Sequence, residues 1–164
     1  MTLDVLTRQQ CQDVRKWRND ELQFLRTPYR LTEEMQDDFY ESVVCNRDSK
    51  HRYYALKENG VFVGMGGLTN IEWENGCAEI SLIINPDMRG HGYGISAVQY
   101  MLMEAFNSLR LETVHGEVYE CGNVGFWQKV VEQYEAFSVW LPNRKYWQGA
   151  LWDSLWFQLT AGPV

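Results

Sequence analysis

The amino-acid sequence lacks the features of several large protein classes. No hydrophobic run is long enough to cross a membrane, and residues 1–4 lack the basic and apolar regions of a signal peptide. There are only three histidines, and the four cysteines, at positions 11, 45, 77 and 121, form no Cys-x-x-Cys pair, which argues against a disulfide framework or a metal site. We therefore expect a soluble, cytoplasmic protein with reduced thiols and no bound metal.

Basic residues are also scarce. The chain has 15 Lys and Arg against 22 Asp and Glu, and the net charge of −7 argues against direct binding to the phosphate backbone of nucleic acids. The same charge mildly favours a cationic or amine-bearing substrate. Hydrophobic residues make up 45% of the 164 positions, which is enough for a folded core, so we predict a single domain spanning residues 1–164.

The chain is organised around residues 80–96, where a hydrophobic strand passes through a glycine-rich turn into a helix. Gly90, Gly92 and Gly94 occupy alternate positions, so backbone N–H groups can face one point without obstruction by side chains. The start of the helix adds unpaired donors and about half a positive charge. This arrangement predicts a binding site for a phosphate or pyrophosphate group.

Other phosphate motifs fit this stretch less well. A P-loop requires Gly-Lys-Ser/Thr, which the sequence lacks. A dinucleotide-binding Gly-x-Gly-x-x-Gly follows its strand directly, whereas residues 85–88 intervene here and the third glycine comes one residue early. The alternative without a ligand is a turn that merely joins a strand to a helix.

Residues 89–94, Arg-Gly-His-Gly-Tyr-Gly, resemble the acetyl-CoA signature Arg/Gln-x-x-Gly-x-Gly/Ala of the GNAT acyltransferase superfamily. Residues 17–19, Trp-Arg-Asn, resemble the N-terminal part of the GNAT branch that contains the ribosomal-protein N-terminal acetyltransferases. The resemblance implies an N-acetyltransferase with acetyl-CoA as co-substrate and an amine-bearing acceptor, either a small molecule or a protein N-terminus. It is also compatible with a homodimer.

The first half of the chain shows clear helix and strand signals. A short strand at residues 3–6 precedes a helix that Thr7 caps, and Thr32 caps a second helix. We expect this second helix to carry Met35, Phe39 and Val43 on its apolar face. Asn-Gly pairs at 59–60 and 75–76 predict two-residue turns that divide residues 51–85 into three antiparallel strands.

The second half continues the alternation. We expect a helix at 94–109, a strand at 111–119, a helix from 123, and strands at 137–141 and 151–159 with a turn at 142–144. The predicted fold class is α/β (α+β), and the order of elements resembles the GNAT fold. That fold has a central, mostly antiparallel mixed sheet of about seven strands, flanked by about four helices.

The resemblance assigns cofactor contacts to three segments. Residues 82–84 would hold the pantetheine arm and polarise the thioester carbonyl, residues 90–95 would bind the pyrophosphate, and Asn123 would meet the cofactor at the start of the last helix. The His91 side chain can instead face solvent, and Asn123 can serve only as a helix cap. The predicted cofactor-binding residues are Leu82, Ile83, Ile84, Arg89, Gly90, His91, Gly92, Tyr93, Gly94, Ile95 and Asn123.

Acyl transfer from a thioester to an amine needs a base, because an alkylamine with a pKa of about 10 is mostly protonated at neutral pH. Glu79 and Glu117 are the candidate bases, although either can be an ordinary exposed strand residue. We favour Glu79, because Pro86 and the glycine turn fix its strand next to the thioester. Glu117 matches the family's base only with a one-residue shift, which reverses the direction of its side chain.

The last helix departs from the GNAT pattern. Many members carry a tyrosine seven residues after the asparagine as the acid for the leaving thiolate, but Val130 stands there, and Trp127 replaces the tyrosine of the usual Phe-Tyr-Glu-Lys. Tyr134 is the nearest replacement, and a coenzyme A thiol with a pKa of about 8.5 can also leave without an acid. A non-catalytic acyl-CoA-binding regulatory module is therefore the alternative function.

The acceptor is the least determined part of the prediction. The resemblance places it beside residues 22–46, so Arg18, Arg26, Tyr29 and Arg30 are candidates for substrate contact, with solvated surface as the alternative for each. No cysteine lies in the glycine motif, so we expect the amine to attack the thioester directly, without a covalent acyl-enzyme.

Overall fold

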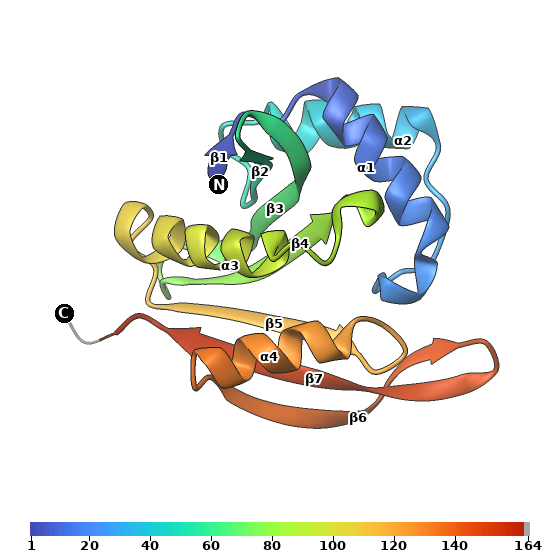
Figure 1. The fold of residues 1–164 in the computed structure, drawn as a ribbon, viewed down its shortest axis with the longest axis vertical. Coiled ribbons are helices and arrows are strands. Elements are labelled where there is room, and N and C mark those ends of the chain that lie inside the picture. Colours follow the sequence, from blue (N-terminus) through green and yellow to red (C-terminus); the bar gives the residue numbers. More distant parts are fainter. Residues whose placement is uncertain (163–164) are drawn as a thin grey trace.

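The computed structural model describes residues 1–162 and contains a seven-stranded sheet in the order β1-β2-β3-β4-β5-β7-β6 (Figure 1). Neighbouring strands are antiparallel except β4 and β5, which run parallel. With four α-helices, this mixed sheet confirms the predicted class and fold. The strands are β1 (Thr2–Asp4), β2 (Arg52–Glu58), β3 (Val61–Glu72), β4 (Cys77–Ile84), β5 (Thr113–Tyr119), β6 (Phe137–Trp147) and β7 (Ala150–Thr160).

The helices cover both faces of the sheet. Helices α1 (Arg8–Asp20) and α2 (Glu33–Phe39) pack on one face, and α3 (Tyr93–Met103) and α4 (Val124–Gln133) pack on the other (Figure 1). The predicted cap at Thr7 is present as a capping box, in which the Thr7 hydroxyl accepts from the backbone N–H of Gln10. None of the helices in residues 1–162 is both long and apolar enough to span a membrane.

The sheet parts in the middle. Strands β4 and β5 are paired over three residues only, from Cys77 opposite Thr113 to Glu79 opposite His115. Beyond that point β4 stays paired with β3, and β5 stays paired with β7. The sheet therefore divides into two halves that diverge toward the carboxyl ends of β4 and β5, and the cavity described below lies between them.

The apolar face of α2 lies one residue later than predicted. Gln36, which is 2% exposed, takes the inward position that we assigned to Met35, and Met35 is 49% exposed. The helix continues into a π-helical turn, η2 (Tyr40–Val44), whose wider turn brings Tyr40 and Val44 into the core beside Phe39. The sequence pattern did not reveal this change of period.

The turns between the first strands also differ in detail. Asn59-Gly60 forms the expected two-residue turn, with φ of 49° and 79°. The prediction for residues 75–76 was wrong in length, because β3 and β4 are joined by the four residues 73–76, of which Gly76 alone has a positive φ, 64°. Strand β1 ends at Asp4, two residues before the predicted end, and the next inward side chain is the buried Leu6.

The last hairpin is longer than predicted. Residues 142–144 do not form a turn but a bulge inside β6, between Leu141 and Lys145. A bulge leaves residues outside the strand pairing, so Pro142 can be accommodated without a backbone N–H. The chain reverses instead at Gln148-Gly149, with φ of 48° and 82°.

Close packing of β5 on β7 gives a test of the fold. A Cβ atom on Gly116 would lie 2.4 Å from the ring of Phe157, which is 1% exposed. Because the buried ring has little room to move, we expect Gly116→Ala to lower the free energy of unfolding by about 1–3 kcal/mol. Gly125→Ala in α4 is the control, since a Cβ there meets nothing within 4 Å. Chemical denaturation measures both, and equal stability of Gly116→Ala and wild type would contradict this packing.

Candidate active site

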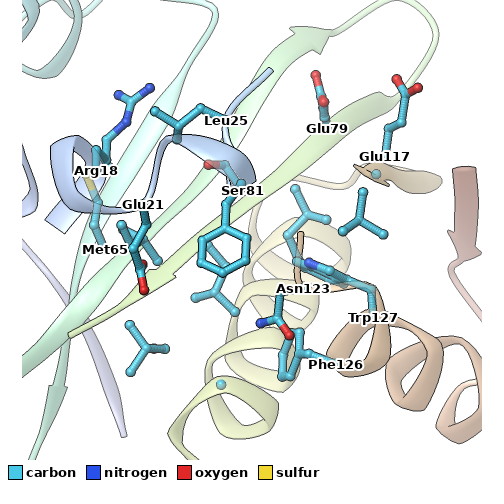
Figure 2. Close-up of a pocket in the computed structure, with 18 of the residues that line it drawn as sticks. Arg18, Glu21, Leu25, Met65, Glu79, Ser81, Glu117, Asn123, Phe126 and Trp127 are labelled. Carbon is cyan, nitrogen blue, oxygen red and sulfur yellow. The ribbon is translucent and has the colours of Figure 1, made fainter. Parts of the chain in front are cut away.

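A cavity of about 770 Å³ occupies the opening between the ends of β4 and β5. Figure 2 shows Glu79 and Glu117 on the neighbouring strands at one end, and Asn123 and Phe126 near the starts of the helices at the other. A smaller cavity of about 410 Å³ shares both glutamates with it. Leu82, Ile83 and Ile84 all line the larger cavity, beyond the last residue of β4 that pairs with β5.

The glycine turn has the backbone geometry expected of an anion site, and anion binding there stays a prediction. Gly92 is the N-cap of α3 and has a φ of 80°, a left-handed conformation that glycine adopts without strain. The first helical hydrogen bond runs from the N–H of Ser96 to the carbonyl of Gly92. The backbone N–H groups of residues 90–95 donate to no acceptor within residues 1–162, and five of these six residues line the cavity.

The starts of α3 and α4 lie close together at this end of the cavity. A Cβ on Gly94 would approach the ring of Phe126 to 2.8 Å, so the absence of a side chain lets the two helices meet. Asn123, the N-cap of α4, makes no side-chain capping bond and is exposed at the cavity. The Asn123 side chain therefore does not cap α4. The N-termini of both α3 and α4 face the cavity.

Two predicted contacts of the glycine motif point elsewhere. Arg89 lines the cavity, but its guanidinium forms a bidentate pair with Glu21 at 2.6 Å and donates to the Ile84 carbonyl at 3.2 Å. The ring Nδ1 of His91 lies 3.0 Å from the Arg89 carbonyl oxygen, and the His91 side chain does not line the cavity. Arg89 thus ties the turn to the end of α1, and His91 braces the turn itself.

The two candidate bases belong to one charge cluster with Arg26 and Arg144. Nη2 of Arg26 lies 2.5 Å from Glu79 and 4.0 Å from Glu117. Glu79 also accepts from Asn70 Nδ2 at 3.1 Å, and its side chain is 17% exposed. The structure therefore brings together the two glutamates that the sequence singled out.

Glu117 is the more constrained of the two. Its carboxylate accepts from Arg144 Nε at 2.8 Å and from the Ser154 hydroxyl at 2.7 Å, and its side chain is 9% exposed. Burial alone would raise the pKa of Glu117, but the hydrogen bonds from Arg144 and Ser154 outweigh it and hold that pKa below its ordinary value of 4.5. Glu117 is consequently a carboxylate with little tendency to take up a proton.

Tyr134 does not reach the cavity. It follows the last residue of α4, about 16 Å along the helix from Asn123, and packs against the core. The structure therefore gives no support to Tyr134 as the acid for the thiolate, and that role stays a prediction. Trp127 lines the cavity in place of a tyrosine, and its ring stacks on Phe157 with the ring centroids 5.0 Å apart.

A buried lysine anchors the loop that forms one wall of the cavity. Lys145, 5% exposed on β6, donates to the carbonyl oxygens of Gln23 at 2.6 Å and Leu25 at 2.5 Å. Burial lowers the pKa of Lys145. These bonds fix the 3₁₀ turn η1 (Leu22–Phe24), which lies between Glu21 and Arg26. The anchor holds residues that contact the glycine turn on one side and Glu79 on the other.

Sequence reasoning missed Glu21, Asn70 and Lys145. Their partners are distant in the chain: Glu21 and Arg89 are 68 residues apart, and Lys145 and Gln23 are 122 residues apart. No local pattern marks such pairs. Of the four candidates near the acceptor site, Arg18 and Arg26 line the cavity, whereas the lining does not include residues 29–30.

A turn with free backbone donors, beside carboxylates at the opening of a sheet, suits acyl transfer from a coenzyme thioester to an amine. A family model described as an acetyltransferase (GNAT) domain matches residues 1–125. The chain therefore belongs to the GNAT acetyltransferase family, and it is an acetyl-CoA-dependent N-acetyltransferase. No group of three or more His, Cys, Asp or Glu side chains in residues 1–162 is arranged to hold a metal ion.

Solved structures show the same fold. The spermidine/spermine N-acetyltransferase SpeG from Vibrio cholerae is 18% identical, with a TM-score of 0.82, covering 97% of this chain and 92% of that chain. The SpeG complex with CoA and spermine is 19% identical, with a TM-score of 0.80 and coverage of 97% and 94%. An N-acetyltransferase from Staphylococcus aureus Mu50 is 15% identical, with a TM-score of 0.80 and coverage of 97% of both chains.

The glycine turn gives a test of cofactor binding. We expect Gly92→Glu to weaken acetyl-CoA binding by more than about tenfold, or 1.4 kcal/mol, because it places a carboxylate where phosphates must approach backbone donors. Gly149→Glu is a matched control: Gly149 has a φ of 82°, against 80° for Gly92, and both have open space at Cβ. The control adds the same charge and the same backbone strain away from the cavity. Calorimetry showing equal affinities for the two variants would place the phosphates elsewhere.

Proposed function

We propose that this chain acetylates a primary amine by direct attack on acetyl-CoA, with Glu79 as the base. The observation that carries the proposal is the position of Glu79, the last residue of β4 that pairs with β5, where the cavity opens. No cysteine of the described chain lines the cavity, which supports direct transfer without an acyl-enzyme.

The proposed reaction uses each wall of the cavity. The amine nitrogen bonds to the thioester carbonyl carbon, the carbon–sulfur bond breaks, and the coenzyme A thiolate leaves. Glu79 takes the proton of the amine, directly or through water. Backbone groups of residues 82–84 polarise the carbonyl, and the N–H groups of residues 90–95 hold the pyrophosphate.

Hydrogen bonding favours Glu79 over Glu117 as the base. An ionised carboxylate offers about four acceptor positions. Glu79 uses two of them, for Arg26 and Asn70, so an incoming amine can bind without displacing either partner. Glu117 is held by Arg144 and Ser154, and its lowered pKa makes it a weaker proton acceptor. We therefore assign Glu117 the role of holding the cluster in place.

We propose that the thiolate leaves without an acid from α4. Trp127 occupies the cavity wall where many family members have a tyrosine, and an indole N–H does not serve as an acid. A coenzyme A thiol with a pKa of about 8.5 is a sufficiently good leaving group, and the thiolate can take a proton from water. The missing tyrosine therefore changes the mechanism and not the reaction.

The structural neighbours suggest where to begin the search for an acceptor. SpeG is a spermidine/spermine N-acetyltransferase and has been solved in a dodecameric form. Aliphatic amines are accordingly the first acceptors to test, and the dodecamer supports self-association in related enzymes. A homodimer and a cytoplasmic location stay predictions for this chain.

The reaction is tested by thiol release. We expect free thiol to appear when the protein is incubated with acetyl-CoA and a panel of peptide, polyamine, amino-sugar and nucleotide amines, because each transfer frees one coenzyme A. A reaction without amine measures hydrolysis. Release with none of the amines, together with tight binding of acetyl-CoA, would favour the non-catalytic acyl-CoA-binding module instead.

The base is tested by a pair of isosteric variants. Glu79→Gln should lower turnover by roughly 10²–10⁴-fold, the usual cost of lost acid–base catalysis, with little change in acetyl-CoA affinity. The loss should shrink as the pH rises toward the pKa of the amine, because more of the amine is then already neutral.

Glu117→Gln is the matched control, and it should lower turnover far less. Profiles of turnover against pH for both variants show whether Glu79 or Glu117 is the base. A severe loss in Glu117→Gln, with Glu79→Gln near wild type at every pH, would reverse the assignment.

A further inference from the structure

Arg18 occupies a position on α1 where an apolar residue would be expected. Cys11 and Val14 are fully buried against the sheet, and Arg18 follows Val14 by four residues, so it lies on the same side of the helix. Its side chain lines the cavity, and Figure 2 shows Arg18 and Glu79 coming from different sides of that space. Burial lowers the pKa of Arg18.

The charges around the two adjoining cavities are nearly all paired. The lining residues include five Arg or Lys side chains and three Glu side chains. Each glutamate has a guanidinium of its own: Glu21 pairs with Arg89, Glu79 with Arg26, and Glu117 with Arg144. The two cations left over are Lys129, exposed on α4, and Arg18.

Within residues 1–162 the guanidinium of Arg18 has no hydrogen-bond or ion-pair partner, whereas the other arginines of the lining do. Arg18 is only partly buried, and its guanidinium is free to donate to a negatively charged ligand in the cavity. Phosphates of the cofactor have their own donors at the glycine turn. Arg18 is therefore available to the acceptor.

Tyr53 lines the same cavity as Arg18 and Glu79. Gly67 of β3 lies opposite Tyr53 of β2 on one side and opposite Ser81 of β4 on the other. A Cβ on Gly67 would lie 2.7 Å from the Tyr53 ring, so the ring covers this glycine. Burial raises the pKa of Tyr53, and the charges of Arg18 and Glu79 act on it in opposite directions.

We propose that Arg18 binds an anionic group of the acceptor, a carboxylate or a phosphate, while the acceptor's amine faces Glu79. The inference rests on the proposed function and narrows its substrate to an amine that carries its own negative charge. The planar guanidinium suits either anion, because it can donate two parallel hydrogen bonds. A polycation is disfavoured, because the lining carries five Arg or Lys side chains against three glutamates and each glutamate is already paired with a guanidinium.

Matched pairs of amines test the proposal. Each pair consists of an anionic amine and its neutral analogue: β-alanine with β-alaninamide, phosphoethanolamine with ethanolamine, and glucosamine 6-phosphate with glucosamine. Spermidine represents the polycations. We expect thiol release with a higher kcat/KM for the anionic member of at least one pair. The first pair reports on a carboxylate and the other two on a phosphate.

Variants on α1 separate Arg18 from general charge effects. In Arg18→Met, the preference for the anionic member, expressed as a ratio of kcat/KM values, should fall by about 10- to 100-fold, mainly through KM. Arg18→Lys should restore part of it. Lys16→Met removes the same charge from an exposed position two residues away and should leave the ratio unchanged, because Lys16 does not line the cavity. Thermal unfolding of each variant checks that it is folded.

Binding and turnover together distinguish this inference from the proposed function. Calorimetry with protein saturated with coenzyme A should show tighter binding of anionic amines to wild type than to Arg18→Met, whether or not they are acetylated. Such binding without thiol release would support the Arg18 site and refute the proposed reaction.

Turnover of neutral amines or spermidine at least as efficient as that of the anionic amines would overturn the Arg18 proposal and leave the reaction standing. The absence of any binding difference between wild type and Arg18→Met would also overturn it.

Discussion

The parting of β4 and β5 is the constraint on which the rest of the structure depends. The two strands share only three paired residues, and each then follows its own half of the sheet. The backbone of residues 82–84 is thereby left unpaired on the side of β5, which makes it available to a ligand. One cavity is lined by the glycine turn, the start of α4 and the carboxylates of both halves of the sheet. These groups can line the same cavity only because the sheet opens there.

Ion pairs and buried donors stabilise the walls of this opening. Arg89 joins the glycine turn to Glu21 at the end of α1, and Arg26 joins the loop after α1 to Glu79. Most of the charge near the cavity is therefore structural, although the same residue types are the usual candidates for catalysis. Glu79, which has spare acceptor positions, and Arg18, which has no partner within residues 1–162, differ from that background, and the two proposals above rest on this difference.

The sequence was informative where local chemistry decides the structure. The strand, glycine turn and helix of residues 80–96, the cap at Thr7 and the Asn59-Gly60 turn are predicted from neighbouring residues, and all three are present. It was misleading where tertiary packing changes a local pattern, as in the π-helical turn after α2 and the bulge in β6. Contacts between distant residues had no signal at all, so the partners of Glu79 and Glu117 and the exclusion of Tyr134 from the cavity required the structure.

The anchoring of η1 by Lys145 has a consequence for the order in which the protein is made. Residues 22–25 leave the ribosome about 120 residues before Lys145 does. Strand β6, which carries Lys145, pairs with β7 alone within residues 1–162, and β7 ends at Thr160. A nascent chain can therefore assemble β1 to β4 and the glycine turn early, but the loop that contains η1 is fixed only after β6 has paired with β7. This wall of the cavity is thus completed later than the strands that lead to the glycine turn, and a chain without β6 and β7 lacks the anchor of η1.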